Sequence, residues 1–189
     1  MCKTQVTEVM NCGMASLSLA VIDQSIERSA LALIAAGSGK ERKYLLQWNV
    51  RWEVFNLIGG KVDNSRGDED SFIRAIRREI EEEMGLSSPQ DCYIVEETKQ
   101  IYLRQYSRRD KVLKNYHFCV FVVEIFPRLR LESSGPKMFA RWLSTGRENV
   151  YVTAAEICRL RTQDGRPISL TTRYILQAMN EIPALCEEV

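Results

Sequence analysis

The sequence has no long apolar run, no pair of cysteines at metal-ligand spacing and almost no net charge. No segment approaches the roughly 18 apolar residues of a membrane-spanning helix, so membrane contact is not expected. A formal net charge of +1 gives no overall field to hold a polyanion, which disfavours nucleic acid and favours a small ligand as partner. The cysteines form no CxxC pair, which argues against zinc and predicts reduced thiols in a cytoplasmic protein. They are Cys2, Cys12, Cys92, Cys119, Cys158 and Cys186.

Histidine is nearly absent as well. The single histidine, His117, follows Tyr116 in an apolar stretch and has no cysteine or serine nucleophile to pair with, so we interpret it as a packed strand residue. The apolar run at 14–22 is interrupted by Ser16 and Ser18, and only Lys3 gives it a charged start. We therefore do not expect a signal peptide.

The 189 residues, of which 45% are hydrophobic and 27% charged, fit one globular domain that needs no disulfide bonds. Because no repeat or low-complexity tract divides the chain, we predict a loose lead-in at 1–14, one domain at 15–182 and a tail at 183–189. Apolar runs between turn residues predict strands at 16–22, 31–36, 44–49, 54–58 and 139–143, and a hairpin of 93–106 with 112–125. Helical periodicity predicts helices at 70–84, 153–160 and 169–180. The pattern favours a layered α/β or α+β domain around a mixed sheet.

Acidic residues crowd onto one turn of the helix predicted at 70–84. Glu79, Glu82 and Glu83 occupy one arc of this helix, whereas Glu81 points elsewhere. Gly85 is of the residue type that commonly ends a helix in a left-handed conformation. The neighbouring arc is an apolar stripe that predicts a face packed on the core. It consists of Ile73, Ile76, Ile80 and Met84.

Converging carboxylates repel one another, so we expect a cation among them. Carboxylates are hard oxygen ligands that suit Mg²⁺ or Mn²⁺, and Mg²⁺ in proteins is usually shared with waters and substrate phosphates. Such ions could neutralise pyrophosphate oxygens and activate water, which is what hydrolysis of a phosphoanhydride requires. The alternative interpretation is a solvated acidic face, because most charge runs on helices face water.

The pattern around the glutamates resembles the signature of the Nudix hydrolase family. Its downstream part runs Arg-Glu, aliphatic, any residue, Glu-Glu, any residue, Gly, aliphatic, and residues 78–86 match every specified position. The upstream part departs twice. Asp70 stands where the family has its first glutamate, and nine residues separate it from Gly60, where the family has five. The loop at 63–69 therefore carries an insertion.

The resemblance implies a Nudix-like α/β/α sandwich around a mixed sheet. It also implies that Glu79, Glu82 and Glu83 bind Mg²⁺ or Mn²⁺ together with the carbonyl of Gly60, with Glu79 a candidate general base. Arg78 would be an orienting residue paired with the first acid of the motif, here Asp70. A tight turn is the alternative role for Gly59 and Gly60.

Other residues are candidates for substrate contacts. Arg104 belongs to a basic hairpin that could contact phosphates, although a charged, solvated sheet edge explains it equally. Several aromatic residues could stack on a base, although most aromatics at strand spacing lie in the core. Glu132, and less so Glu124, could supply a further catalytic acid, as a late loop sometimes does in the family. The aromatic candidates are Trp48, Trp52, Phe55, Tyr102, Tyr106 and Tyr116.

Our hypothesis is a Mg²⁺- or Mn²⁺-dependent hydrolase that cleaves a phosphoanhydride bond in a nucleoside diphosphate linked to another moiety. One alternative is a Nudix-type module that binds a nucleotide or metabolite and regulates a partner without hydrolysis. An isomerase-like use of the fold is a weaker alternative, because no cysteine–glutamate arrangement can be assigned to carbon chemistry. The oligomeric state is left open, with a homodimer as one option.

Overall fold

The computed structural model describes residues 7–8, 22–107, 110–126 and 148–184. Its larger sheet has five strands in the order β1-β7-β8-β2-β6. These are β1 (Thr7–Glu8), β2 (Ile22–Leu33), β6 (Ile58–Lys61), β7 (Cys92–Ser107) and β8 (Val112–Ile125). The sheet is mixed, because β2 runs parallel to β8 while the β7–β8 and β2–β6 pairs are antiparallel.

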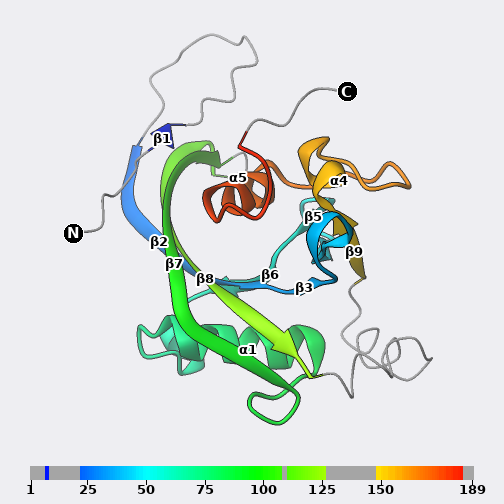
Figure 1. The fold of residues 1–189 in the computed structure, drawn as a ribbon. Coiled ribbons are helices and arrows are strands. Elements are labelled where there is room, and N and C mark those ends of the chain that lie inside the picture. Colours follow the sequence, from blue (N-terminus) through cyan, green and yellow to red (C-terminus); the bar gives the residue numbers. More distant parts are fainter. Residues whose placement is uncertain (1–6, 9–21, 108–109, 127–147, 185–189) are drawn as a thin grey trace, which may run out of the picture.

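A second sheet lies beside the first (Figure 1). In it β4 (Lys43–Asn49) pairs antiparallel with β3 (Ala35–Ala36), β5 (Val54–Asn56) and β9 (Asn149–Thr153). Because β3 follows β2 after a single residue and β6 follows β5 after one residue, the two sheets are joined directly. The short 3₁₀ turns η1 (Gly39–Glu41) and η2 (Asn64–Arg66) lie in loops.

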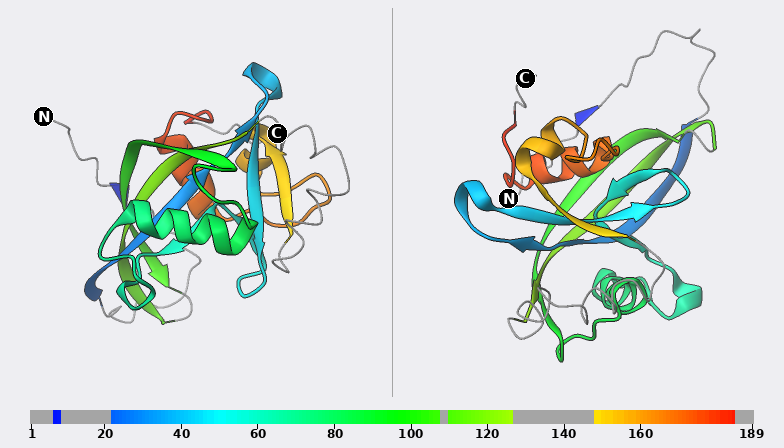
Figure 2. Two further views of the ribbon diagram at one scale, coloured as in Figure 1. Left: turned by 90° about the horizontal axis from the view of Figure 1, so that it is seen from below. Right: turned by 90° about the vertical axis from the view of Figure 1, so that its right-hand side faces the viewer.

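Helices cover opposite sides of the sheets (Figures 1 and 2). Helix α1 (Phe72–Met84) packs on one side, and α5 (Leu170–Ala178) lies on the other with the short α4 (Ala154–Cys158). The alternation of strand side chains divides the core in two, because Ala32 contributes to the α1 side and Leu33 to the α5 side. This layered, mixed α+β arrangement confirms the predicted fold class.

Most of the predicted elements are present, but β2 also covers 23–30, which were not predicted as strand. Strands β6 and β9 were not predicted. Gly59 and Gly60 lie inside β6 rather than in a turn after a strand. The predicted strand at 139–143, and all but the end of the one at 16–22, lie outside the described residues, and the predicted domain limits stay a prediction. None of the described helices is both long and apolar enough to cross a membrane.

The prediction of reduced thiols is wrong for Cys158. Cys158, at the end of α4, is disulfide-bonded, whereas Cys92 and Cys119 are buried and form no disulfide. Burial raises the pKa of the Cys92 thiol to about 11, which keeps it protonated and unreactive. The prediction of a cytoplasmic location rested on six reduced thiols, so it loses part of its support and stays a prediction.

Candidate active site

Helix α1 places the acidic residues against β6. The Ser71 side chain accepts a hydrogen bond from the Arg74 amide at the start of the helix, and Gly85 ends it at φ 64°. The predicted apolar stripe faces the core: Ile76, Ile80 and Met84 are fully buried, and Ile73 packs against them. Burial of this stripe fixes the rotation of the helix, so its acidic arc is turned toward the adjacent strand.

A cavity of about 400 Å³ lies between α1, β6 and the turn between β4 and β5. The three predicted glutamates border it, with Glu79 and Glu83 only 8% and 7% exposed and Glu82 more open. Glu81 is exposed and lies outside the cavity lining, as expected. The lining consists of Asn49, Trp52, Gly59, Gly60, Arg66, Glu79, Glu82 and Glu83.

Both glycines of β6 are required by close contacts. Gly59 has φ 137°, and a Cβ there would lie 2.2 Å from the Ala30 carbonyl oxygen of the neighbouring strand. A Cβ on Gly60 would lie 2.2 Å from Oε1 of Glu79. Only a residue without a side chain therefore lets the β6 backbone and the Glu79 carboxylate share this wall of the cavity.

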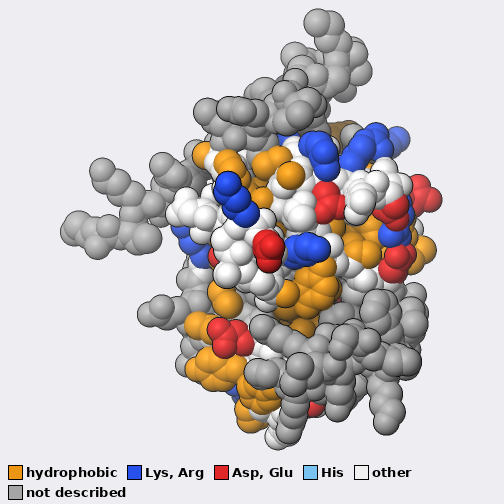
Figure 3. Space-filling view, turned by 45° about the vertical axis from the view of Figure 1, so that its right-hand side comes forward, with side chains coloured by type: hydrophobic (Ala, Val, Ile, Leu, Met, Phe, Trp, Pro, Cys, Tyr) orange, Lys and Arg blue, Asp and Glu red, His pale blue; other side chains and the backbone are white. Residues whose placement is uncertain are grey.

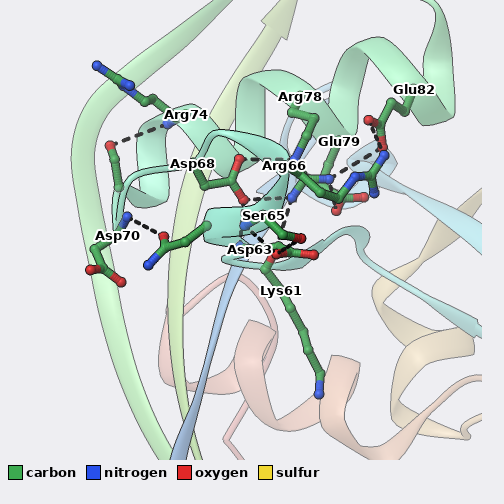
Figure 4. Close-up of polar contacts among 12 residues, drawn as sticks. Lys61, Asp63, Ser65, Arg66, Asp68, Asp70, Arg74, Arg78, Glu79 and Glu82 are labelled. Atoms are coloured by element: carbon green, nitrogen blue, oxygen red, sulfur yellow. Dashed lines mark hydrogen bonds and ion pairs between the residues drawn. The ribbon is translucent and has the colours of Figure 1, made fainter.

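Arg78 joins the loop, the strand and the helix (Figure 4). Its guanidinium donates to both carboxylate oxygens of Asp68, at 3.0 and 2.8 Å, and to the Lys61 carbonyl at 3.0 Å. The Nη1 group donates to Glu79 Oε1 at 2.7 Å. The bonds from Arg78 hold the pKa of Asp68 below its ordinary value, and those to Asp68 and then Glu79 raise the pKa of Arg78. The network fixes the direction of Glu79.

The predicted pair of Asp70 with Arg78 is wrong. Asp70 instead pairs with Arg28 of β2 at 3.2 Å, and its side chain is 72% exposed. Asp68, 1% exposed, takes the expected role. The reason is local geometry: Glu69 and Asp70 both have positive φ, which turns Asp70 outward before the helix begins. The one sequence signal for Asp68 is that it follows Gly67, which closes η2 at φ 86°.

The three glutamates have different partners. Glu83 Oε2 accepts from the Gly59 amide at 3.3 Å, and Glu82 pairs with Arg66 and also accepts from Arg78 at 3.3 Å. Within the described residues, no three acidic, cysteine or histidine side chains stand ready to hold one metal ion as they are placed. The donors still fit a hard divalent ion in kind, since carboxylates and the Gly60 backbone border one cavity. Their joint binding of ions stays a prediction.

A family comparison decides the assignment. The model of the NUDIX domain matches residues 26–168, which include the acidic helix, β6 and all of the smaller sheet. The chain belongs to the Nudix family. Comparison with curated proteins found no matching sequence.

Solved structures show the same Nudix fold at low sequence identity. The Caenorhabditis elegans Ap4A hydrolase is 11% identical with a TM-score of 0.52, over 83% of this chain and 98% of that one. The NUDIX domain of Shewanella oneidensis NrtR in complex with ADP ribose is 13% identical with a TM-score of 0.51, over 84% and 89%. The structure of Shewanella oneidensis NrtR with a 27mer DNA is 13% identical with a TM-score of 0.53, over 81% of this chain and 60% of that one. The present chain thus spans less than two thirds of the length of NrtR.

Among the other predicted contact residues, Phe55 is wrong as a base platform. It is fully buried and packs against Trp48 and under the Arg166 guanidinium, so its ring offers no face to a ligand. Arg104 and Tyr106 lie on β7 and do not line the cavity. Arg104 donates to Asn115 at 3.0 Å.

The remaining candidates lie away from the cavity or cannot be placed. Glu132 lies outside the described residues, and Glu124 is exposed near the end of β8. His117 stacks on Tyr102, and burial, with the nearby Arg28 charge, lowers its pKa, as suits a packed strand residue.

Two lining residues, Asn49 and Arg66, were not anticipated. Asn49 ends β4, and its Oδ1 accepts from the amides of Arg51 and Trp52, each at 3.1 Å. This side chain therefore shapes the turn that brings Trp52 to the cavity. Asn49 carried no sequence signal beyond the turn preference of asparagine.

Proposed function

We propose that this Nudix protein is a divalent-metal-dependent hydrolase of a phosphoanhydride bond in a nucleoside diphosphate linked to another moiety. The observation that carries the proposal is that Glu79, Glu82, Glu83 and Gly60 border one cavity. On a merely solvated acidic face the carboxylates would be exposed, whereas Glu79 and Glu83 are buried beside the glycines of β6. The family assignment adds the expectation of a pyrophosphate substrate.

Each residue then has a defined role. Arg78, anchored by Asp68, holds Glu79 at 2.7 Å and keeps its carboxylate directed at the cavity. Glu79 is the candidate general base, because it lies next to the Gly60 backbone where a water and a phosphate would meet. Mg²⁺ or Mn²⁺, held by the three glutamates and the Gly60 carbonyl, would supply neutralisation of phosphate charge and activation of water.

A substrate screen tests this function. Nucleotide sugars, dinucleoside polyphosphates, ADP-ribose and nucleoside triphosphates are incubated with the protein and Mg²⁺ or Mn²⁺, and phosphate-containing products are followed by chromatography. We expect products from at least one pyrophosphate-linked nucleotide, and none when EDTA is present. Release of products at an unchanged rate in EDTA, or no products from any compound, would contradict the proposal.

The second candidate is a regulator that binds a nucleotide without hydrolysing it. It is favoured by the arginine contacts of Glu79 and Glu82 and by the likeness to the NrtR domain that was solved with ADP ribose. Thermal stabilisation by ADP-ribose without product formation would support it over hydrolysis. Binding of nucleic acid has weaker support here, because basic and acidic side chains lie interspersed on the face in Figure 3 and the net charge is +1.

Trp52 is the aromatic residue best placed to contact a nucleobase. It is 60% exposed and lines the cavity, unlike the fully buried Phe55. Base stacking on an aromatic ring is worth about 1–3 kcal/mol. We therefore expect Trp52→Ala to raise KM for the nucleotide about 10-fold with little change in kcat. The matched control is Val50→Ala in the same turn, which is 68% exposed but outside the lining. Equal KM values for the two variants would exclude stacking by Trp52.

A further inference from the structure

Arg66 is a positive charge placed inside an otherwise acidic cavity. It is the last residue of η2, in the lengthened loop before α1, and it lines the same cavity as the three glutamates. Its guanidinium forms an ion pair with Glu82 (Figure 4). The ion pair joins the loop insertion directly to a residue that the proposed function assigns to metal binding.

The loop that carries Arg66 is well ordered by its own hydrogen bonds. Asp63 Oδ1 accepts from the Ser65 amide at 2.9 Å, and the Gly67 amide donates to the Asn64 carbonyl at 3.2 Å. The backbone of η2 is therefore fixed next to the cavity. The Arg66 side chain, by contrast, is 49% exposed and can adopt other rotamers.

Glu82 has an arginine at each carboxylate oxygen. Arg66 contacts Oε1, and Arg78 contacts Oε2 at 3.3 Å. Arg78 is anchored by Asp68, whereas Glu82 is the one ion-pair partner of Arg66 among the described residues. A divalent ion bound at Oε1 would repel the guanidinium beside it and compete with it for the lone pairs of that oxygen. Metal binding therefore favours displacement of the more weakly anchored arginine, which is Arg66.

We propose that Arg66 is a phosphate-binding residue that covers Glu82 until the metal site is loaded and then turns to the pyrophosphate of the substrate. The inference rests on the proposed function. Because Arg66 lies on the wall of the same cavity, its guanidinium stays within the site when it is displaced from Glu82. A planar guanidinium matches the oxygens of a phosphate with two hydrogen bonds, so this second partner is the chemically suited one.

Opposite shifts in two affinities test this exchange. In Arg66→Ala the Mn²⁺ site loses a competing charge, so we expect Mn²⁺ alone to bind about two- to fivefold more tightly by titration calorimetry. The same variant at saturating Mn²⁺ is expected to bind α,β-methylene ADP, a diphosphate that cannot be hydrolysed, about 10- to 100-fold more weakly. Arg66→Lys, which keeps the charge but not the two-bond geometry, is expected to fall between.

Arg74→Ala is the matched control. Arg74 forms the same kind of exposed ion pair between α1 and this loop, with Glu69, but it does not line the cavity. Both affinities should be unchanged in this variant. The proposed movement of Arg66 from Glu82 to the substrate is wrong if Arg66→Ala does not tighten the binding of Mn²⁺. It is also wrong if this variant binds the diphosphate as tightly as wild type does. In both cases the metal site itself is not contradicted. If the wild-type protein binds no Mn²⁺, the proposed function fails together with this inference.

Discussion

Glu83→Gln is expected to lower kcat of the proposed hydrolysis about 10³-fold while leaving the fold intact. Glu83 borders the cavity at 7% exposure, and the amide of glutamine can still accept the hydrogen bond from the Gly59 amide. The substitution thus removes the charge needed to bind a divalent ion but conserves the volume and one contact. Glu82→Gln should have a similar effect, since it removes a second proposed ligand.

Measurement of kcat at saturating Mg²⁺ and Mn²⁺, with a circular dichroism melt, separates loss of function from loss of fold. Glu81→Gln is the control, because Glu81 lies on the same turn of α1 but is exposed and outside the cavity. It should retain wild-type activity. Near-normal rates in Glu83→Gln and Glu82→Gln at saturating metal would exclude these residues as metal ligands needed for turnover.

The helix and its acidic face could be predicted because the information is local. The apolar stripe that includes Ile76 and Ile80 has helical spacing, and Gly85 marks the end, so the orientation of Glu79 and Glu83 follows from helix geometry. The β7–β8 hairpin, β4 and β5 were predictable for the same reason, since apolar runs and turn residues alternate along the chain. Strand β6, β9 and most of β2 were not predicted, and β9 is defined mainly by its pairing with β4.

The loop contacts could not be predicted, because they depend on how a lengthened segment folds. Counting along the family motif selects Asp70, yet the chain brings Asp68 to Arg78, since positive φ at two following residues turns Asp70 toward Arg28. Arg66 gave no sequence signal, because its contact with Glu82 depends on the 3₁₀ turn. The burial of Phe55 was also hidden, because a three-residue strand is too short to show which face is inward.

These contacts explain how the carboxylates of the cavity can lie close together despite their like charges. Arg78 is a fixed positive charge that offsets the negative charges of Asp68 and Glu79, since it is bonded to both and is itself largely buried. Arg66 compensates the more exposed Glu82 from a side chain that can move. The cavity therefore combines one fixed and one exchangeable positive charge, which would suit the proposed binding of cations and then of an anionic substrate.

Asp68→Asn is expected to lower the free energy of unfolding at pH 7 by about 3 kcal/mol, because it breaks a buried, doubly hydrogen-bonded pair and leaves the Arg78 charge less compensated. The side chains of Asp68 and Arg78 are only 2% and 13% exposed. Asp70→Asn is the matched control, since its carboxylate is 72% exposed, and it should change the free energy by about 0.5 kcal/mol or less. Urea unfolding followed by circular dichroism measures both. Equal destabilisation by the two substitutions would contradict the assignment of Asp68 as the partner of Arg78.

The same pair predicts a dependence on pH. Hydrogen bonds from Arg78 lower the pKa of Asp68 in the folded protein, so the carboxylate contributes stability above its unfolded pKa of about 3.9 and loses it as the pH falls through the lower folded value. The difference in unfolding free energy between wild type and Asp68→Asn should therefore be full at pH 7 and shrink below about pH 4. Asparagine does not titrate, so the narrowing must come from the wild-type protein. A difference that stays constant from pH 7 to well below the folded pKa would show that the destabilisation comes from packing and not from the charge of Asp68.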